Sequence, residues 1–212
     1  MFAPLPVDRH LRRWIQLVAG LVAFGVGLAL VFLADLGLPP WDVLHEGISE
    51  RLGLPVGSVI SLVGAVMVLF MIVLREPLGV GTLLNVLIIG AVVDLVMWAV
   101  DDPTSMPVRI GFLIAGPLMV GLAGGLYLGV DMGAGPRDGT MTALGRRGVR
   151  IAWARFAIEA SAFLGGLALG GTAGFGTVWF LVAIGPATEW SVNRFVLVDA
   201  DGSNRTVALG ES

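Results

Sequence analysis

Long apolar stretches alternate with short polar segments over most of the chain. Six stretches contain few or no charged residues, and they lie at about 14–34, 55–74, 78–100, 108–130, 151–173 and 175–193. Each stretch is close to the ~20 residues that a helix needs to cross a bilayer. The pattern predicts an all-α polytopic membrane protein with about six transmembrane helices.

Two of the six stretches are less uniform than the others. The stretch 151–173 contains Arg155 and Glu159, and 175–193 is interrupted by Pro186. Side chains four residues apart meet on one helix face, so Arg155 and Glu159 can form a self-neutralising structural pair. Ionisable groups within a span are costly and mark functional sites, so both residues are also candidates for a binding site.

The polar segments 40–53 and 136–148 are too short and too charged to cross a bilayer. In the first segment Trp41, Leu44 and Ile48 recur at helical spacing, which predicts a short amphipathic helix. Such a helix lies along the membrane surface, or it enters the membrane as a re-entrant element buried in protein. Asp42 and Asp138 stand near the starts of the two segments. Each aspartate either caps its helix or belongs to a binding site.

Composition narrows the class of protein. The chain has 212 residues, of which 56% are apolar and 14% are charged, against ~25% charged in soluble domains. The mean hydropathy is +0.89. These values exclude disordered, collagenous and nucleic-acid-binding classes. The absence of cysteine and the presence of only two histidines argue against a metal site. We expect no catalytic residues, no cofactor and no enzymatic activity, because no nucleophile–base pair is visible.

The basic residues are all arginine, and their positions predict the orientation. If the N-terminus is cytoplasmic, Arg51 and Arg109 lie outside. The inside then holds Arg9, Arg12, Arg13, Arg75, Arg137, Arg146, Arg147, Arg150, Arg194 and Arg205. Cytoplasmic loops of membrane proteins carry such an excess of positive charge. We therefore expect the segment 1–13 and the tail 194–212 to be cytoplasmic.

The chain also contains an internal repeat. The segment Asp35-Leu-Gly37-Leu-Pro-Pro-Trp-Asp42 shares four of eight residues with Asp131-Met-Gly133-Ala-Gly-Pro-Arg-Asp138, 96 residues later. Further along, a G-x-G-T motif recurs at an offset of 95. The repeat predicts two three-span units, 14–100 and 108–193, joined by a linker at 101–107. Three spans is an odd number, so the two units must have opposite orientations in the membrane.

The G-x-G-T motifs open the third span of each unit. Free N–H groups at a helix start can receive an anion, whereas a tight turn between packed spans explains the same glycines without a ligand. Asn85 adds a polar side chain one turn beyond the first motif. The candidate solute-binding residues are Asp42, Gly79, Gly81, Thr82, Asn85, Asp138, Arg155, Glu159, Gly174, Gly176 and Thr177.

A stripe of glycines follows the fourth predicted span at a spacing of four residues. Its members are Gly121, Gly125, Gly129 and Gly133. Small residues at this spacing let two helices approach closely. We expect the stripe to pack against the first span of the same chain, and a homodimer contact is the alternative.

The segment Leu36–Ser49, which follows the pattern L-G-x-x-P-W-D-x-L-x-x-G-[LI]-S, carries a family resemblance together with the L-x-x-G-x-G-T of Leu78–Thr82. Both are similar to the YczE/YyaS/YitT-like group of bacterial integral membrane proteins. The resemblance implies this architecture and a bacterial plasma membrane, and it implies no catalytic residue.

The repeat and the intramembrane charges favour a small secondary transporter that moves an unidentified small solute by alternating access. The alternative is a non-transporting accessory or scaffold protein of the membrane. The expected partners are the lipid bilayer and a small solute, and no nucleic acid.

Overall fold

The computed structural model describes residues 10–148 and 150–198, and this part of the chain is all helical. Its eight helices are α1 (His10–Ala34), α2 (Pro40–Leu52), α3 (Val56–Val73), α4 (Val80–Ala99), α5 (Met106–Leu128), α6 (Pro136–Gly145), α7 (Ile151–Leu169) and α8 (Phe175–Phe195). The all-α prediction is confirmed. The six predicted spans correspond to the six longer helices within a few residues at each end.

Four helices among the described residues are long and apolar enough to cross a membrane, namely α1, α3, α4 and α5. Helices α7 and α8 are not among these four. Helix α7 carries Arg155 and Glu159, and α8 carries Pro186 and Glu189, all of which lower the mean hydropathy. The structure thus defines a helical protein with several candidate membrane spans.

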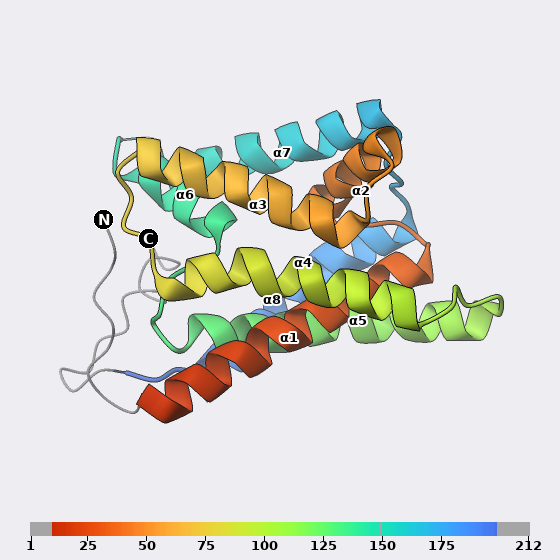
Figure 1. The fold of residues 1–212 in the computed structure, drawn as a ribbon, viewed down its shortest axis with the longest axis horizontal. Coiled ribbons are helices and arrows are strands. Elements are labelled where there is room, and N and C mark those ends of the chain that lie inside the picture. Colours follow the sequence, from red (N-terminus) through yellow and green to blue (C-terminus); the bar gives the residue numbers. More distant parts are fainter. Residues whose placement is uncertain (1–9, 149, 199–212) are drawn as a thin grey trace.

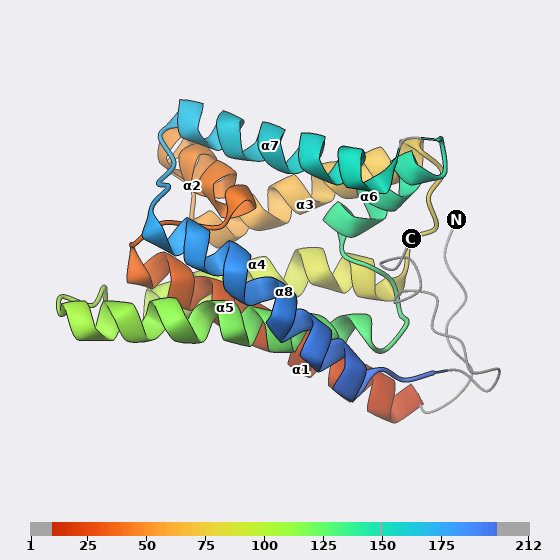
Figure 2. The same ribbon diagram turned by 180° about the vertical axis from the view of Figure 1, so that it is seen from behind.

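The helices form two layers (Figures 1 and 2). One layer contains α1, α4, α5 and α8, in which α1 packs on α5 and α4, and α5 packs on α8. The other layer contains the short helices α2 and α6 with α3 and α7, in which α2 packs on α7 and α6 packs on α3. Helix α1 runs opposite to α5, as α3 does to α7 and α4 to α8 (Figure 1).

The glycine stripe of α5 packs inside the chain, but against a different helix than predicted. A Cβ built on Gly121 would lie 2.4 Å from the Cβ of Ala187, and one on Gly125 would lie 2.3 Å from the Oγ of Ser191. Both contacts are with α8, so the predicted packing against α1 is wrong for these positions. Helix α1 instead approaches α5 at Gly116, on another face of the helix.

Arginines bind backbone carbonyls at the ends of helices from the other half of the chain. Arg13 donates to the carbonyl of Val130 at 2.7 Å, and Arg109 donates to that of Ala34 at 2.8 Å. Each residue of the second contact stands 96 positions from its equivalent in the first. These bonds satisfy carbonyl groups that a helix leaves without a partner at its C-terminus.

The same exchange occurs at the C-terminal ends of the short helices. Arg51, at the end of α2, donates to the carbonyl of Leu169 at 3.1 Å. Arg147, just beyond α6, donates to that of Leu74 at 2.8 Å. The offsets between these residues are 96 and 95. Equivalent arginines of the two halves therefore bind equivalent carbonyl groups of the opposite half.

Glu76, in the α3–α4 connection, gives a pH-dependent prediction. Its carboxylate lies 3.4 Å from Arg146 and is almost fully buried, and burial raises the pKa of Glu76 above 4.5. A carboxyl whose pKa is raised on folding stabilises the protein fully below its unfolded pKa, and this contribution is lost as the pH rises through the folded pKa. Relative to Glu76→Gln, the wild-type chain is therefore expected to lose stability above pH 4.5.

Thermal unfolding of both proteins in detergent, from about pH 4 to about pH 8, measures this difference. Parallel stability curves for the wild-type chain and Glu76→Gln would contradict the assignment.

Candidate functional site

The two short helices begin inside the molecule. Residues 35–39 and 131–135 turn back into the bundle, and the turns place Asp35 and Asp131 at φ 47° and 54°. Gly37 and Gly133 follow at φ 110° and 117°, values that favour glycine. Helices α2 and α6 start near the middle of the molecule and run outward to opposite ends (Figure 2). Both helices contact α3 and α7. We call residues 35–39 and 131–135 the re-entrant loops, because they turn back into the bundle of helices.

The G-x-G-T motifs hold the re-entrant loops in place. The amide of Gly81 donates to the carbonyl of Met132 at 2.7 Å, and the amide of Gly176 donates to that of Leu36 at 2.7 Å. Thr82 adds a bond from its Oγ1 to the carbonyl of Ala134 at 2.7 Å. The motif of one half thus binds the loop of the other half.

Tight packing accounts for the glycines of these motifs. A Cβ on Gly79 would lie 2.2 Å from the carbonyl oxygen of Met132, and one on Gly174 would lie 2.8 Å from that of Leu36. The hydroxyl of Thr177 accepts a bond from the amide of Gly174 at 3.1 Å. These contacts favour the tight-turn interpretation over an anion site.

Polar side chains from three helices meet at the start of α6. The hydroxyl of Tyr127, the Nδ2 of Asn85 and the Oδ2 of Asp138 all lie within 4 Å of the position that a Cβ on Gly135 would take. The Tyr127 hydroxyl is 3.5 Å from the Asp138 carboxylate. Glycine at 135 leaves room for these groups.

Arg137 extends this group toward α2 and α7. Its Nε lies 3.8 Å from Asp138, and the charges of Asp138, Glu159 and Asp42 all act on the guanidinium. The side chain of Arg137 is partly exposed, with 41% of its surface accessible. Arg137 stands in the first turn of α6, and its assignment to the cytoplasmic side of the membrane stays a prediction.

Asp42 does not cap its helix in the way that the sequence suggested. It stands at the third position of α2, and its Oδ1 pairs with the Nδ1 of His45 at 3.0 Å. Both side chains are buried. Asp138 occupies the same position of α6 and contacts Tyr127 and Arg137 instead of a backbone amide.

Arg155 and Glu159 form the predicted pair on α7, with Nε and Oε1 3.2 Å apart. Arg155 is exposed, whereas Glu159 is only partly exposed and its charge reaches Arg137. Glu159 therefore belongs with the interior charges. We define the central polar cluster as Asp42, Asn85, Tyr127, Arg137, Asp138 and Glu159.

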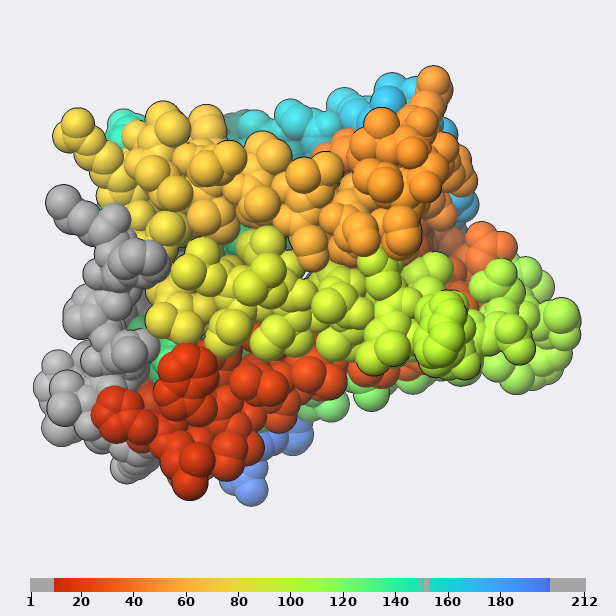
Figure 3. Space-filling model, viewed as in Figure 1, coloured from red at the N-terminus to blue at the C-terminus, as the bar shows by residue number. Residues whose placement is uncertain are grey.

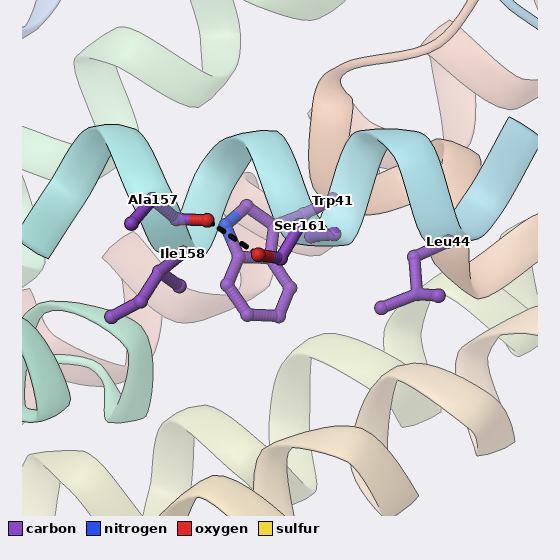
Figure 4. Close-up of a pocket in the computed structure, with 6 residues that line it drawn as sticks. Trp41, Leu44, Ala157, Ile158 and Ser161 are labelled. Carbon is purple, nitrogen blue, oxygen red and sulfur yellow. Dashed lines mark hydrogen bonds between the residues drawn. The ribbon is translucent and has the colours of Figure 1, made fainter.

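An apolar pocket of about 400 Å³ lies beside this cluster, between α2 and α7. It is lined by Trp41, Leu44, Ala157, Ile158, Ser161 and Ala162. Figure 4 shows the Trp41 ring against α7, and its buried Nε1 has no hydrogen-bond partner. In the part of the chain that the structure describes, no group of His, Asp and Glu could hold a metal ion.

The helices and their interior charges define the class as a multi-pass helical membrane protein. The model of a family of unknown function, DUF6198, matches residues 11–193, and the chain belongs to this family.

Two relatives support the assignment to this family. An uncharacterized protein of Haemophilus influenzae is 35% identical over 178 residues, covering 84% of this chain and 82% of the relative. The uncharacterized membrane protein YczE of Bacillus subtilis is 30% identical over 205 residues, covering 94% of this chain and 95% of YczE. No solved structure matches this chain. The resemblance to the YczE-like group is confirmed.

Proposed function

We propose that the chain is a small secondary transporter of the bacterial plasma membrane, with the central polar cluster as its solute site. One observation carries the proposal: charged side chains from both halves converge where two half-length helices begin. Ionisable groups inside a membrane bundle are costly to retain unless they serve a function. Transporters place their sites at such interrupted helices, near the middle of the bilayer.

The proposed architecture is an inverted repeat of three spans per unit, with α7 and α8 as the fifth and sixth spans. Three features support it. Equivalent helices run in opposite directions (Figure 1). The arginine bonds recur at offsets of 96 and 95. The G-x-G-T motif of each half binds the re-entrant loop of the other. An inverted repeat gives a transporter two equivalent conformations that face opposite sides.

Both termini are proposed to be cytoplasmic. Arg12 and Arg13 at the start of α1, Arg146 and Arg147 after α6 and Arg194 near the end of α8 lie at one end of the bundle (Figure 1). The opposite end has Arg51 and Arg109. This imbalance supports the orientation predicted from the positive-inside rule.

Asn85→Cys tests for a hydrated site without knowledge of the solute. The chain has no cysteine, so a charged, membrane-impermeant thiol reagent reports on position 85 alone. If solute reaches the cluster by alternating access, Asn85→Cys is expected to react when the reagent is applied to either side of sealed vesicles. Ala29→Cys, in the closed core of α1, is the control and is expected to stay unmodified.

A cluster that excludes water would leave Asn85→Cys as unreactive as Ala29→Cys. That result would contradict the solute site and favour the accessory protein, particularly if a second polypeptide co-purified from native membranes. If Asn85→Cys reacts, vesicles loaded with a pH-sensitive dye and challenged with amino acids, organic amines and organic acids identify the cargo. Glu159→Gln is expected to slow that flux, because it removes one of the interior charges.

A further inference from the structure

The two halves differ in how their second and third long helices pair. Helix α3 packs on α4, and their side chains meet along the face seen in Figure 3. The Oγ of Ser61 donates to the carbonyl of Val86 at 2.7 Å, and a Cβ on Gly90 would lie 2.2 Å from the carbonyl oxygen of Gly57. Helices α7 and α8 do not form a corresponding pair among the described residues.

The face of α8 that would meet α7 is open. Gly185 stands 95 residues after Gly90, and a Cβ built on it would have no atom within 4 Å. Val178 and Leu181, the equivalents of Leu83 and Val86, are exposed. A face that is closed in one half is therefore unoccupied in the other, at the same positions of the repeat.

In the first half of the chain, a carboxylate on α4 binds the start of α3. The Oδ1 of Asp94 on α4 accepts a bond from the amide of Gly57 at 2.6 Å, and its Oδ2 accepts one from the Oγ of Ser58 at 2.8 Å. These groups stand in the first turn of α3, where free amides and the helix dipole attract a negative charge. The equivalent of Asp94 in the second half is Glu189, which is exposed on α8.

Each short helix is attached to a long helix of the other half. Helix α2 packs closely on the end of α7, since a Cβ on Gly171 would lie 2.0 Å from the carbonyl oxygen of Val43. Gly139 of α6 is in similar contact with Met71 of α3. The layer of α2, α3, α6 and α7 therefore carries four members of the central polar cluster, and Asn85 and Tyr127 lie on the other layer.

We propose that Asp94 and Glu189 are alternating latches between the two layers, an inference that rests on the inverted repeat of the proposed function. In the described conformation Asp94 holds the start of α3. In the second conformation α7 closes on α8, Glu189 binds the start of α7, and α3 separates from α4. Because the central polar cluster is divided between the layers, this rocking opens the solute site alternately on its two sides.

Three cysteine pairs in the full-length chain test the latches in vesicles. Gly64→Cys with Val86→Cys reports the α3–α4 contact, because a Cβ built on Gly64 would lie 3.6 Å from the Cβ of Val86. Glu159→Cys with Leu181→Cys, 95 residues later, reports the expected α7–α8 contact, and both pairs leave Asp94 and Glu189 in place. Gly124→Cys with Thr188→Cys is the control, because a Cβ on Gly124 would lie 3.6 Å from Thr188 in the α5–α8 contact. A disulfide forms only when the two Cα atoms come within about 7 Å.

After mild oxidation, labelling with a maleimide polymer counts the remaining thiols by gel shift. The control pair and the 64/86 pair are expected to link rapidly. The 159/181 pair is expected to link more slowly, and Asp94→Asn is expected to accelerate it by releasing the first latch. A 159/181 pair that stays reduced in both backgrounds, while the control pair is fully linked, would overturn the proposal.

The cross-linking test of the latches and the labelling test of the solute site can fail independently. Latches that exchange while Asn85→Cys stays unreactive would contradict the solute site and retain the latches. The reverse result would contradict the latches and retain the site.

Discussion

Gly79→Ala is expected to destabilise the protein by about 3 kcal/mol, because its new methyl group meets backbone atoms that cannot rotate away. The added Cβ would lie 2.2 Å from the carbonyl oxygen of Met132 and 2.4 Å from the Cα of Gly133. Relief requires the re-entrant loop to move, which breaks the bond from the amide of Gly81 to Met132. Thermal unfolding in detergent, followed by size exclusion, measures the loss of folded protein.

Two further glycines provide controls for this result. Gly111, on α5, has no atom within 4 Å of a built Cβ, so Gly111→Ala is expected to leave stability within about 1 kcal/mol of the wild-type value. Gly174→Ala makes the equivalent contact in the other half at a longer distance, 2.8 Å from the carbonyl oxygen of Leu36. Its effect should fall between the other two. Equal effects at all three positions would refute the clash as the cause.

The sequence predicted the helices well, because apolar runs of membrane length leave few alternatives to a helix. It also predicted Asp42, Asn85, Asp138 and Glu159 as candidate site residues, since polar groups within apolar stretches are conspicuous. The structure brings Asn85 and Asp138 to the same point at Gly135, and the charges of Asp42 and Glu159 act on the neighbouring Arg137; their role in a solute site stays a prediction. The G-x-G-T motifs were equally conspicuous, but their amides are used to hold the re-entrant loops.

Tyr127 and Arg137 were missed because each resembles a common feature of a membrane surface. A tyrosine near the end of a span resembles an interfacial anchor, and an arginine after a span resembles a cytoplasmic charge. Tyr127 is instead buried where α5 packs on Phe24, and Arg137 reaches the start of α6 because the loop 131–135 turns back into the bundle. The signal for this turn was present in the repeated D-x-G, where an aspartate and a glycine adopt positive φ. The glycine stripe shows that a helix packs closely on α5 but not which helix, so the predicted partner was wrong.

Arg13→Gln is expected to destabilise the protein by about 3 kcal/mol, because it leaves a buried carbonyl group without its charged donor. The side chain of Arg13 is almost fully enclosed, with 1% of the residue exposed, and its Nη1 donates to the carbonyl of Val130 at 2.7 Å. A shorter glutamine cannot reach this carbonyl from the same Cα position. Guanidinium groups make stronger hydrogen bonds than neutral donors, so the loss exceeds that of an ordinary hydrogen bond.

Arg109→Gln is the matched comparison, because it removes the equivalent bond in the other half. Arg109 donates to the carbonyl of Ala34 and pairs with Asp35 at 2.8 Å, but 24% of its side chain is exposed and Asp35 is largely in contact with solvent. Water can replace the lost partner there, so the expected cost is about 1 kcal/mol. Chemical denaturation of both variants in mixed micelles measures the difference. Equal losses of stability in the two variants would contradict burial as the reason for the larger cost at Arg13. The hydrogen bond to the carbonyl group, which both arginines make, would then account for the loss at both positions.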